Sequence, residues 1–265
     1  MTRLNFRHEG LTLSYLDSGG ELPVIIALHA HWMEAVTFSG LADAVSSEWR
    51  LIALDQRGHG DSDHADSYTR DNYLGDIEAF FSHLTLKNAV LLGNSLGGVN
   101  AYQFAARHPE RVLALVIEDI GVEIAGDLPP MSGWAGMFAT RRELDDQVGL
   151  RMVPYLRASY RQTTGGWKLA FEPSDMILSQ AAMVGDHWAD WLATSCPALV
   201  IRGTESRVTT AAQVEEMAAR RANTQVCTLV GGHVVHQDNP AGFAAAVRSF
   251  LRSRLQAPGA EAIRR

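Results

Sequence analysis

The chain has 265 residues, of which 46% are hydrophobic, and it carries a formal net charge of −7 at pH 7. A chain of this length and apolar content can bury a substantial core, and α/β domains of this size commonly fold as one unit. The acidic balance argues against a nucleic acid or an anionic membrane as a partner, because both attract basic surfaces.

The sequence shows no membrane or export segment. Apolar runs stay well short of the ~18 residues that cross a bilayer, and the first residues lack the apolar centre of a signal peptide. Cys196 and Cys227 flank separate expected strands and form neither a CxxC motif nor a metal-binding Cys/His pattern. We therefore expect a cytoplasmic protein with free thiols and no cofactor or metal, which acts on a small molecule as a monomer or homodimer.

Short β-branched runs alternate with longer stretches of helical periodicity along most of the chain. This alternation predicts strands joined by crossover helices, in a mostly parallel sheet of about eight strands flanked by helices. Residues 11–16 alternate like a strand with one buried face, whereas most later runs are continuously apolar, as in strands covered on both faces. The expected strands span residues 11–16, 24–28, 51–54, 89–92, 112–117, 198–201 and 226–230.

Two helices are marked by apolar residues at helical spacing, between positions 73 and 84 and between positions 243 and 251. Each pattern predicts one face packed against the core. Asn239 is expected to cap the second of these helices and Pro240 to open it.

Residues 122–196 interrupt the alternation. They contain one Pro-Pro pair, one Gly-Gly pair and four tryptophans, but no convincing strand. We interpret them as a helical cap inserted after the sixth strand, between core segments 1–121 and 197–256, with a flexible tail at 257–265. An insertion at the carboxyl end of a strand lies where α/β proteins bind ligands. Its aromatic side chains form either a small core of their own or a pocket wall, and the second alternative predicts Trp134, Phe138 and Trp188 as substrate-binding residues.

The segment GNSLGG at residues 93–98 directly follows an expected strand and directly precedes a helical stretch. This arrangement is typical of a nucleophile elbow, in which a strand turns abruptly into a helix. The turn crowds the backbone, so that side chains at 93 and 97 would clash, and it presents the Ser95 hydroxyl. The alternatives are a plain glycine-rich turn and a dinucleotide-binding loop, but the latter requires G-x-G-x-x-G and position 95 is Ser.

Three further segments join this elbow in one resemblance. LHAHW at 28–32 resembles an H-G oxyanion segment, DQRGHGDS at 55–62 resembles a D-x-R-G-x-G-x-S loop, and GH at 232–233, followed by DNP at 238–240, resembles a histidine loop and last helix. Together they resemble the α/β-hydrolase superfamily, in its branch of serine esterases and C-C hydrolases with a helical cap. The resemblance covers the chain apart from the cap, and it implies the α/β-hydrolase fold and serine-hydrolase chemistry.

The resemblance implies a general base in the loop after the last strand, where the chain offers His233 and His236. We assign the base to His233, because it follows two glycines at the end of the strand and stands in the G-H position. His236 is expected to line the substrate pocket. The alternative for His233 is a histidine on a surface loop.

The acid of the expected triad is ambiguous. The resembled family usually carries an Asp after the penultimate strand, but the corresponding position here is Ser206. Glu205, one position earlier, and Asp119, which follows the strand at 112–117, can replace it. We favour Asp119, because it fits the chain order Ser, Asp, His and because some members with similar sequences carry their acid there. Ser206 then hydrogen-bonds the histidine or the acid, and the alternative role for Asp119 is a helix cap.

The backbone N–H groups of His31 and Leu96 are expected to form the oxyanion hole, the latter at the positive amino terminus of a helix. Ala30 replaces the usual Gly of this segment, and it permits close approach as long as its backbone is not left-handed. Trp32 is expected to face the pocket as a substrate-binding residue, with packing under the cap as the alternative. His29 is expected to be buried and hydrogen-bonded.

The charged loop at 55–64 contains Asp55, His59, Asp61 and His64, which together suggest a metal site. In the resembled family this loop is structural, held by its own charges and glycines. No other segment supplies ligands at metal-site spacing, so we expect no metal.

A serine nucleophile, a histidine base and an oxyanion hole support acyl transfer through an acyl-enzyme on Ser95. The expected function is hydrolysis of a carboxylic ester, or a related activated carbonyl, of a small and largely apolar substrate. Two alternatives stay open: a C-C bond hydrolase of vinylogous diketones or a lactonase, and, from another class, a ligand-binding protein that keeps the fold without turnover.

Overall fold

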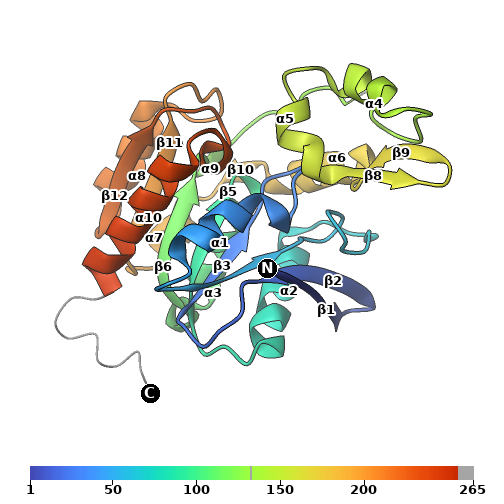
Figure 1. The fold of residues 1–265 in the computed structure, drawn as a ribbon. Coiled ribbons are helices and arrows are strands. Elements are labelled where there is room, and N and C mark those ends of the chain that lie inside the picture. The colour runs from blue at the N-terminus through green and yellow to red at the C-terminus, as the bar shows by residue number, and fades with distance from the viewer. Residues whose placement is uncertain (132, 256–265) are drawn as a thin grey trace.

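The computed structural model describes residues 1–131 and 133–255 and centres on an eight-stranded sheet. The sheet has the order β1-β2-β4-β3-β5-β6-β11-β12 (Figure 1). Its strands are β1 (Thr2–His8), β2 (Leu11–Asp17), β3 (Val24–Leu28), β4 (Arg50–Leu54), β5 (Ala89–Asn94), β6 (Val112–Glu118), β11 (Ala198–Gly203) and β12 (Thr224–Leu229). The expected tail at 257–265, and position 256 of the expected core, lie outside the described residues.

Pairing in the sheet is antiparallel only at its first edge. β1 pairs antiparallel with β2 and β2 with β4, while the six strands from β4 to β12 in the sheet order run parallel. Because parallel strands end on the same side, the loops that follow β3, β5, β6 and β12 meet at one edge of the sheet. These loops carry the candidate catalytic residues.

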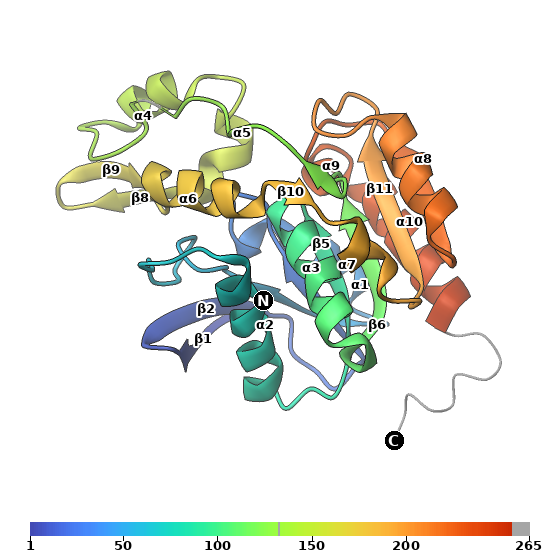
Figure 2. The same cartoon turned by 180° about the vertical axis from the view of Figure 1, so that it is seen from behind.

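Helices cover both faces of the sheet, which explains why the central strands are continuously apolar. One face packs against α2 (Arg70–His83), α3 (Leu96–Arg107), α7 (Trp188–Leu192) and α8 (Ala211–Arg220). The other packs against α1 (Ser39–Val45) and α10 (Pro240–Leu255), with the short α9 (Val235–Asp238) just before α10. In β3, Ile26 contributes to the first core and Ile25 to the second, as the two-residue period of a strand requires. Figures 1 and 2 show the two layers from opposite sides.

The expected fold is confirmed, and each strand predicted from the sequence overlaps an observed strand of the sheet. β1 had no such prediction. It is an edge strand in which only Phe6 is buried, so its sequence lacks the apolar run that marks the central strands. At the other end, Asn239 Oδ1 accepts a hydrogen bond from Gly242 N at 3.0 Å, as expected of a cap.

The segment between β6 and β11 is not purely helical, which corrects the expectation that it holds no strand. Its α-helices are α4 (Arg141–Val148), α5 (Val153–Leu156), α6 (Pro173–Met183) and the short α7 described above, which packs against the sheet. A hairpin joins β8 (Tyr160–Thr163) to β9 (Gly166–Leu169), and β7 (Glu123–Ile124) pairs with β10 (Gly185–Asp186) where the segment leaves and rejoins the core. Directly after the hairpin turn, β9 begins at Gly166 with φ +129°, a conformation that favours glycine. In Figure 1 this segment lies above the edge of the sheet, and we refer to residues 122–196 as the cap.

The cap has a small apolar core of its own, which is separate from the two cores of the sheet. Trp134, Leu144, Leu156, Phe171 and Met176 are buried in it. The cap therefore gains stability by burying its own apolar side chains as well as by contacting the rest of the chain.

Polar contacts fasten the cap to the loops at the edge of the sheet. Arg161 Nη2 lies 2.5 Å from Glu34 Oε2, in the loop after β3, and 3.0 Å from Asp61 Oδ1. On α6, Asp175 Oδ2 accepts a hydrogen bond from Tyr68 OH at 2.7 Å. The cap is thus attached to the loops that follow β3 and β4.

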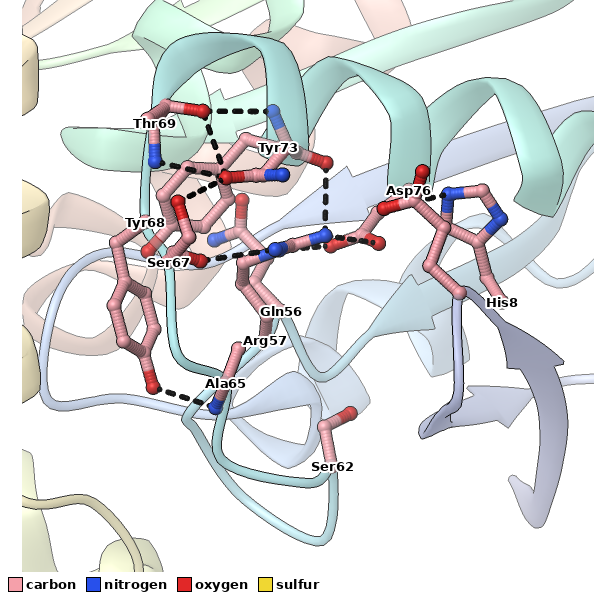
Figure 3. Close-up of polar contacts among 12 residues, drawn as sticks. His8, Gln56, Arg57, Ser62, Ala65, Ser67, Tyr68, Thr69, Tyr73 and Asp76 are labelled. Carbon is pink, nitrogen blue, oxygen red and sulfur yellow. Dashed lines mark hydrogen bonds and ion pairs between the residues drawn. The ribbon is translucent and has the colours of Figure 1, made fainter.

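The charged loop after β4 is held by a buried ion pair. Arg57 donates two hydrogen bonds to Asp76 on α2, at 2.7 and 2.8 Å, and further bonds to the carbonyl oxygens of Ser67 and Asn72 (Figure 3). Such a two-pronged contact fixes the orientation of the guanidinium. In the described part of the chain, no group of three or more His, Cys, Asp or Glu is arranged to hold a metal ion, and no helix has the length and apolarity to cross a membrane.

The burial of Glu34 makes stability depend on pH. Burial raises the pKa of Glu34 to about 7, although Arg161 opposes the shift. Glu34 therefore binds its proton more tightly in the folded protein than in the unfolded chain. The contribution of this proton to the free energy of unfolding is complete below about pH 4.5 and is lost as the pH rises to about 7. Relative to Glu34→Gln, we expect the wild type to lose on the order of 3 kcal/mol of unfolding free energy over this range.

The measurement is denaturant unfolding of both proteins at a series of pH values. Glu215→Gln, which removes an exposed carboxylate from α8, is the matched control and should show no such trend. A pH-independent difference between wild type and Glu34→Gln would contradict the raised pKa.

Candidate active site

Ser95 stands at the turn between β5 and α3, in a backbone conformation that side chains rarely adopt. Its φ and ψ are +51° and −116°, and it is the residue immediately before the first residue of α3. Strained conformations of this kind persist only where the surrounding structure imposes them. The turn places the serine at the edge of the sheet with the amino terminus of a helix directly behind it, where the helix dipole favours negative charge.

The glycines on either side of Ser95 are required by the lack of space. A Cβ added to Gly93 would lie 2.1 Å from the carbonyl oxygen of Gly97, and one added to Gly97 would lie 2.1 Å from the carbonyl oxygen of Leu28. Neither position tolerates a side chain without moving the backbone. The motif is therefore explained by the packing of α3 against β3 and β5.

His233 contacts the carboxylate of Asp119, although 114 positions separate them in the chain. His233 Nδ1 lies 2.7 Å from Asp119 Oδ2. Since a carboxylate accepts, the imidazole donates its Nδ1–H, and the neutral ring then keeps a lone pair on Nε2. Asn94, next to Ser95, donates to the carbonyl oxygen of His233 at 3.1 Å and so ties the histidine loop to the elbow.

The carboxylate of Asp119 is fully buried and accepts three further hydrogen bonds. The donors are Ser206 Oγ at 2.5 Å, Thr209 Oγ1 at 2.7 Å and Gly203 N at 3.3 Å. Asp119 itself has φ +50°. These contacts fix the carboxylate in the orientation in which Oδ2 meets the imidazole.

Glu205, the alternative acid, lies elsewhere. It is exposed, and its carboxylate makes no hydrogen bond or ion pair with the described residues, whereas its backbone N–H donates to Gly231 O at 2.9 Å. Ser206 occupies the role expected of it beside the acid. Thr209 was not singled out in the sequence, although its position three residues after Ser206 is the only signal that could have suggested it.

Of the two expected oxyanion donors, Leu96 directly follows Ser95, and His31 lies in the loop after β3, the strand that pairs with β5. Leu96 N begins α3, and neither this N–H nor that of His31 donates to another group in the described part of the chain. Ala30 avoids a positive φ, whereas Trp32 adopts φ +70°. Ala in place of Gly at position 30 therefore fits the local backbone without strain.

Three buried histidines lie close together at the segment after β3, two within this segment and one in the loop after β4. Burial lowers the pKa of His31 and His59 well below the ordinary value, and it lowers the pKa of His29 to about 4. His29 Nε2 accepts a hydrogen bond from Gln56 N at 3.0 Å, as expected of a buried structural residue. All three imidazoles are therefore neutral at pH 7.

A cavity of about 450 Å³ lies where these loops meet the cap, and Ser95, His31, His233 and Trp32 line it. Much of the remaining wall is apolar, including Ile120, Ile124, Leu128, Met152 and Met183. Wall residues between 120 and 129 directly follow Asp119 and were not expected from the sequence. Their only signal is that they continue the chain from the end of a strand that carries a site residue. Within the described residues the Ser95 hydroxyl has no hydrogen-bond partner, so it is free to meet a ligand in this cavity.

The three aromatic cap residues that were expected to bind substrate do not line the cavity. Trp134 is buried in the cap core and donates its Nε1–H to Gln147 O at 3.1 Å. Phe138 pairs with Trp167 through backbone hydrogen bonds and packs on the same core. Trp188 is buried against the sheet, where it donates to Glu123 at 2.8 Å. These indole and phenyl groups are used for packing, because a cap of this size needs a core of its own.

His236 also points away from the cavity, contrary to expectation. Its Nδ1 lies 2.7 Å from the buried carboxylate of Glu118, and its ring stacks on Phe38 with centroids 4.5 Å apart. A short helix, α9, begins at Val235 and turns this side chain into the core. Of the five side chains expected to bind substrate, Trp32 alone lines the cavity.

Known proteins resemble this chain in both sequence and structure. Residues 25–246 match a family model described as "Alpha/beta hydrolase family". The 2-(acetamidomethylene)succinate hydrolase of Mesorhizobium japonicum is 24% identical over 262 residues, covering 91% of this chain and 92% of that protein. The sn-1-specific diacylglycerol lipase ABHD11 of Mus musculus is 27% identical over 267 residues, covering 91% and 85%.

Among solved structures, that of E-2-(acetamidomethylene)succinate hydrolase superposes with a TM-score of 0.81 at 22% identity, covering 94% of this chain and 99% of the other. At this level of identity the likeness concerns the fold alone.

The contact between Asp119 and His233 predicts which acid variant loses activity. Asp119→Asn keeps the shape but no longer favours the Nδ1–H tautomer, so we expect kcat for any ester substrate to fall by roughly 10³- to 10⁴-fold. Glu205→Gln should leave kcat close to that of the wild type, because Glu205 is exposed and does not contact the imidazole. Steady-state kinetics of both variants provides the test, and the reverse pattern would assign the acid to Glu205.

Proposed function

We propose that this chain, which belongs to the alpha/beta hydrolase family, hydrolyses a carboxylic ester or related activated carbonyl of a small, largely apolar substrate. The observation that carries the proposal is the contact of His233 Nδ1 with the buried carboxylate of Asp119, together with the cavity that His233 and Ser95 both line. A serine, a histidine and an acid in this relation are the parts of a nucleophilic acyl-transfer site.

In the proposed reaction, Ser95 Oγ attacks the carbonyl carbon and its proton passes to His233 Nε2. The negative charge of Asp119 stabilises the imidazolium that forms. The N–H groups of Leu96 and His31 stabilise the tetrahedral oxyanion, aided by the amino terminus of α3. The hydroxyl and imidazole come within hydrogen-bonding reach when substrate binds, because catalytic contacts often tighten only in the complex.

The alcohol leaves as its oxygen takes the proton from His233 Nε2, and the acyl group remains on Ser95. Water then attacks the acyl-enzyme while Nε2 accepts its proton. Collapse of the second tetrahedral intermediate releases the carboxylic acid and returns the proton to Ser95. Every step uses side chains of this chain and water alone.

The cavity supports the proposed size and polarity of the substrate. Its volume of about 450 Å³ lies in the lower part of the range typical of small-molecule sites, and much of its wall is apolar. Among the relatives, the mouse protein is named as a lipase, which favours ester hydrolysis, while the Mesorhizobium protein is named as a succinate-derivative hydrolase. We propose the ester as the substrate because it needs no group beyond those at Ser95, His233 and the oxyanion donors.

The first test is hydrolysis of p-nitrophenyl acetate, butyrate and octanoate by the wild type and by Ser95→Ala. We expect turnover by the wild type and a loss of at least roughly 10³-fold in Ser95→Ala, because the acyl-enzyme cannot form. Circular dichroism checks that both proteins are folded, and Ser174→Ala, which removes an exposed hydroxyl from α6, is the matched control and should keep the wild-type rate.

Three results are informative. Serine-dependent turnover supports the esterase proposal, and its dependence on acyl length measures the pocket. A single burst of p-nitrophenol without turnover would favour a binding protein that acylates but does not release product. Equal rates for wild type and Ser95→Ala would refute a serine nucleophile.

A further inference from the structure

The side chain of His31 belongs to a buried hydrogen-bond chain that the proposed reaction does not use. Its Nε2 lies 2.9 Å from Ser179 Oγ on α6 of the cap, and Ser179 Oγ lies 2.8 Å from Tyr73 OH on α2. The exposed fractions of His31, Ser179 and Tyr73 are 4%, 0% and 1%. The chain therefore runs from the core, through the cap, to the residue whose backbone N–H is proposed as an oxyanion donor.

The direction of these hydrogen bonds follows from the rule that buried donors find acceptors. In the described part of the chain Tyr73 OH has one polar partner, Ser179 Oγ, so the phenol must donate to it. Burial raises the pKa of Tyr73, so the phenol keeps the proton that it donates, and the guanidinium groups of Arg57 and Arg70 lie 6.0 and 5.4 Å from its ring centre. Figure 3 shows Tyr73 beside Arg57 on this side of α2.

Ser179 then has one proton left to give and one partner left to receive it. Its hydroxyl already accepts from Tyr73, so it donates to His31 Nε2. Because burial keeps His31 neutral, a ring that accepts at Nε2 carries its proton on Nδ1. The chain Tyr73, Ser179, His31 thus fixes one tautomer of the imidazole.

The remaining nitrogen of His31, Nδ1, is placed differently from the sealed nitrogens of the neighbouring imidazoles. Nδ1 has no hydrogen-bond partner among residues 1–131 and 133–255, yet it is not one of the side-chain atoms that are both sealed from solvent and without a partner. His31 also lines the same cavity as Ser95 and His233. The buried atoms without a partner include His59 Nε2 and His236 Nε2, which shows how differently Nδ1 of His31 is placed.

We propose that His31 Nδ1–H donates a hydrogen bond to an acceptor oxygen in the acyl part of the substrate, so that the site selects acyl groups with an ether or carbonyl oxygen near the scissile bond. This inference deepens the proposed ester hydrolysis and rests on it for its substrate. In the proposed complex the leaving group lies toward His233 Nε2, which protonates it, and the acyl group lies toward the loop of His31 in the same cavity. Ser179 and Tyr73 are positioning residues, because they act only through the imidazole.

The donor is neutral, which distinguishes this selection from recognition of an anion. A neutral hydrogen bond contributes about 0.5–1.5 kcal/mol, or roughly a 2- to 10-fold preference, whereas a polar group left without a partner costs more. The site should therefore prefer an oxygen over a methylene without requiring a charge on the substrate.

The first part of the test observes the tautomer without any substrate. In protein labelled with ¹⁵N-histidine, we expect the ¹⁵N shifts of His31 to report a protonated Nδ1 and an unprotonated Nε2, with the signal assigned by its loss in His31→Phe. Ser179→Ala should abolish this preference, while Ser174→Ala, which removes an exposed hydroxyl from the same helix, should preserve it. A protonated Nε2 or an imidazolium at pH 7 would overturn the inference.

The second part compares p-nitrophenyl methoxyacetate with p-nitrophenyl butyrate, whose acyl groups differ by an ether oxygen in place of one methylene. The ratio of their kcat/KM values, taken relative to the wild type, removes the difference in intrinsic reactivity. We expect this ratio to fall roughly 2- to 10-fold in His31→Phe and in Ser179→Ala, and to stay unchanged in Ser174→Ala. Ser179→Thr, which keeps a hydroxyl, should restore the ratio.

The two parts separate failure of this inference from failure of the proposed function. If the ratio is unchanged in His31→Phe while hydrolysis still requires Ser95, the acyl contact is refuted and the esterase proposal stands. If no ester is turned over by any variant, the proposed function fails, and the tautomer measurement alone decides whether Nδ1 carries the proton.

Discussion

The arrangement of the site depends on burying one carboxylate at the edge of the sheet. Asp119 follows β6 with a positive φ, and its carboxylate gathers donors from the loops after β11 and β12. A buried carboxylate is stable only where its oxygens are paired, so these three loops must approach one another. Once they do, the position of His233 relative to the elbow is fixed through Asn94, which bonds to both sides.

Much of the fold was predictable because its signals are local. Apolar runs at β3, β5 and β6 identify strands covered on both faces, and the GNSLGG segment identifies its own turn because close packing excludes side chains at Gly93 and Gly97. β1 escaped prediction because an edge strand needs few apolar residues, and the β8–β9 hairpin because a short exposed ladder has no apolar pattern. The local signal is weak where a strand buries only one of its side chains fully.

The candidate site was predictable to the extent that each residue sits in its own motif. Ser95 and His233 were proposed from neighbouring glycines, and Asp119 was favoured from the chain order and the resemblance. The hydrogen bonds of Asp119 with Ser206 and Thr209, in contrast, depend on β6 and β11 being adjacent in the sheet, a relation between segments far apart in sequence. The pocket wall was the least predictable part. Trp134 and Trp188 have the composition of a ligand site, yet Trp134 is buried in the core of the cap and Trp188 in the core on one face of the sheet. Part of the wall comes instead from residues that follow Asp119.

The pairing of β7 with β10 places the two ends of the cap side by side. An insertion whose ends meet can be exchanged for another of different length without disturbing the strands on either side, because the distance between the two points of attachment stays the same. Ile124 of β7 also belongs to the cavity wall, so such an exchange replaces part of the binding surface together with the cap, while the machinery at Ser95 and His233 stays in place. Because of this junction, the part of the binding surface that the cap provides can be exchanged as one unit, separately from the residues proposed to carry out the reaction.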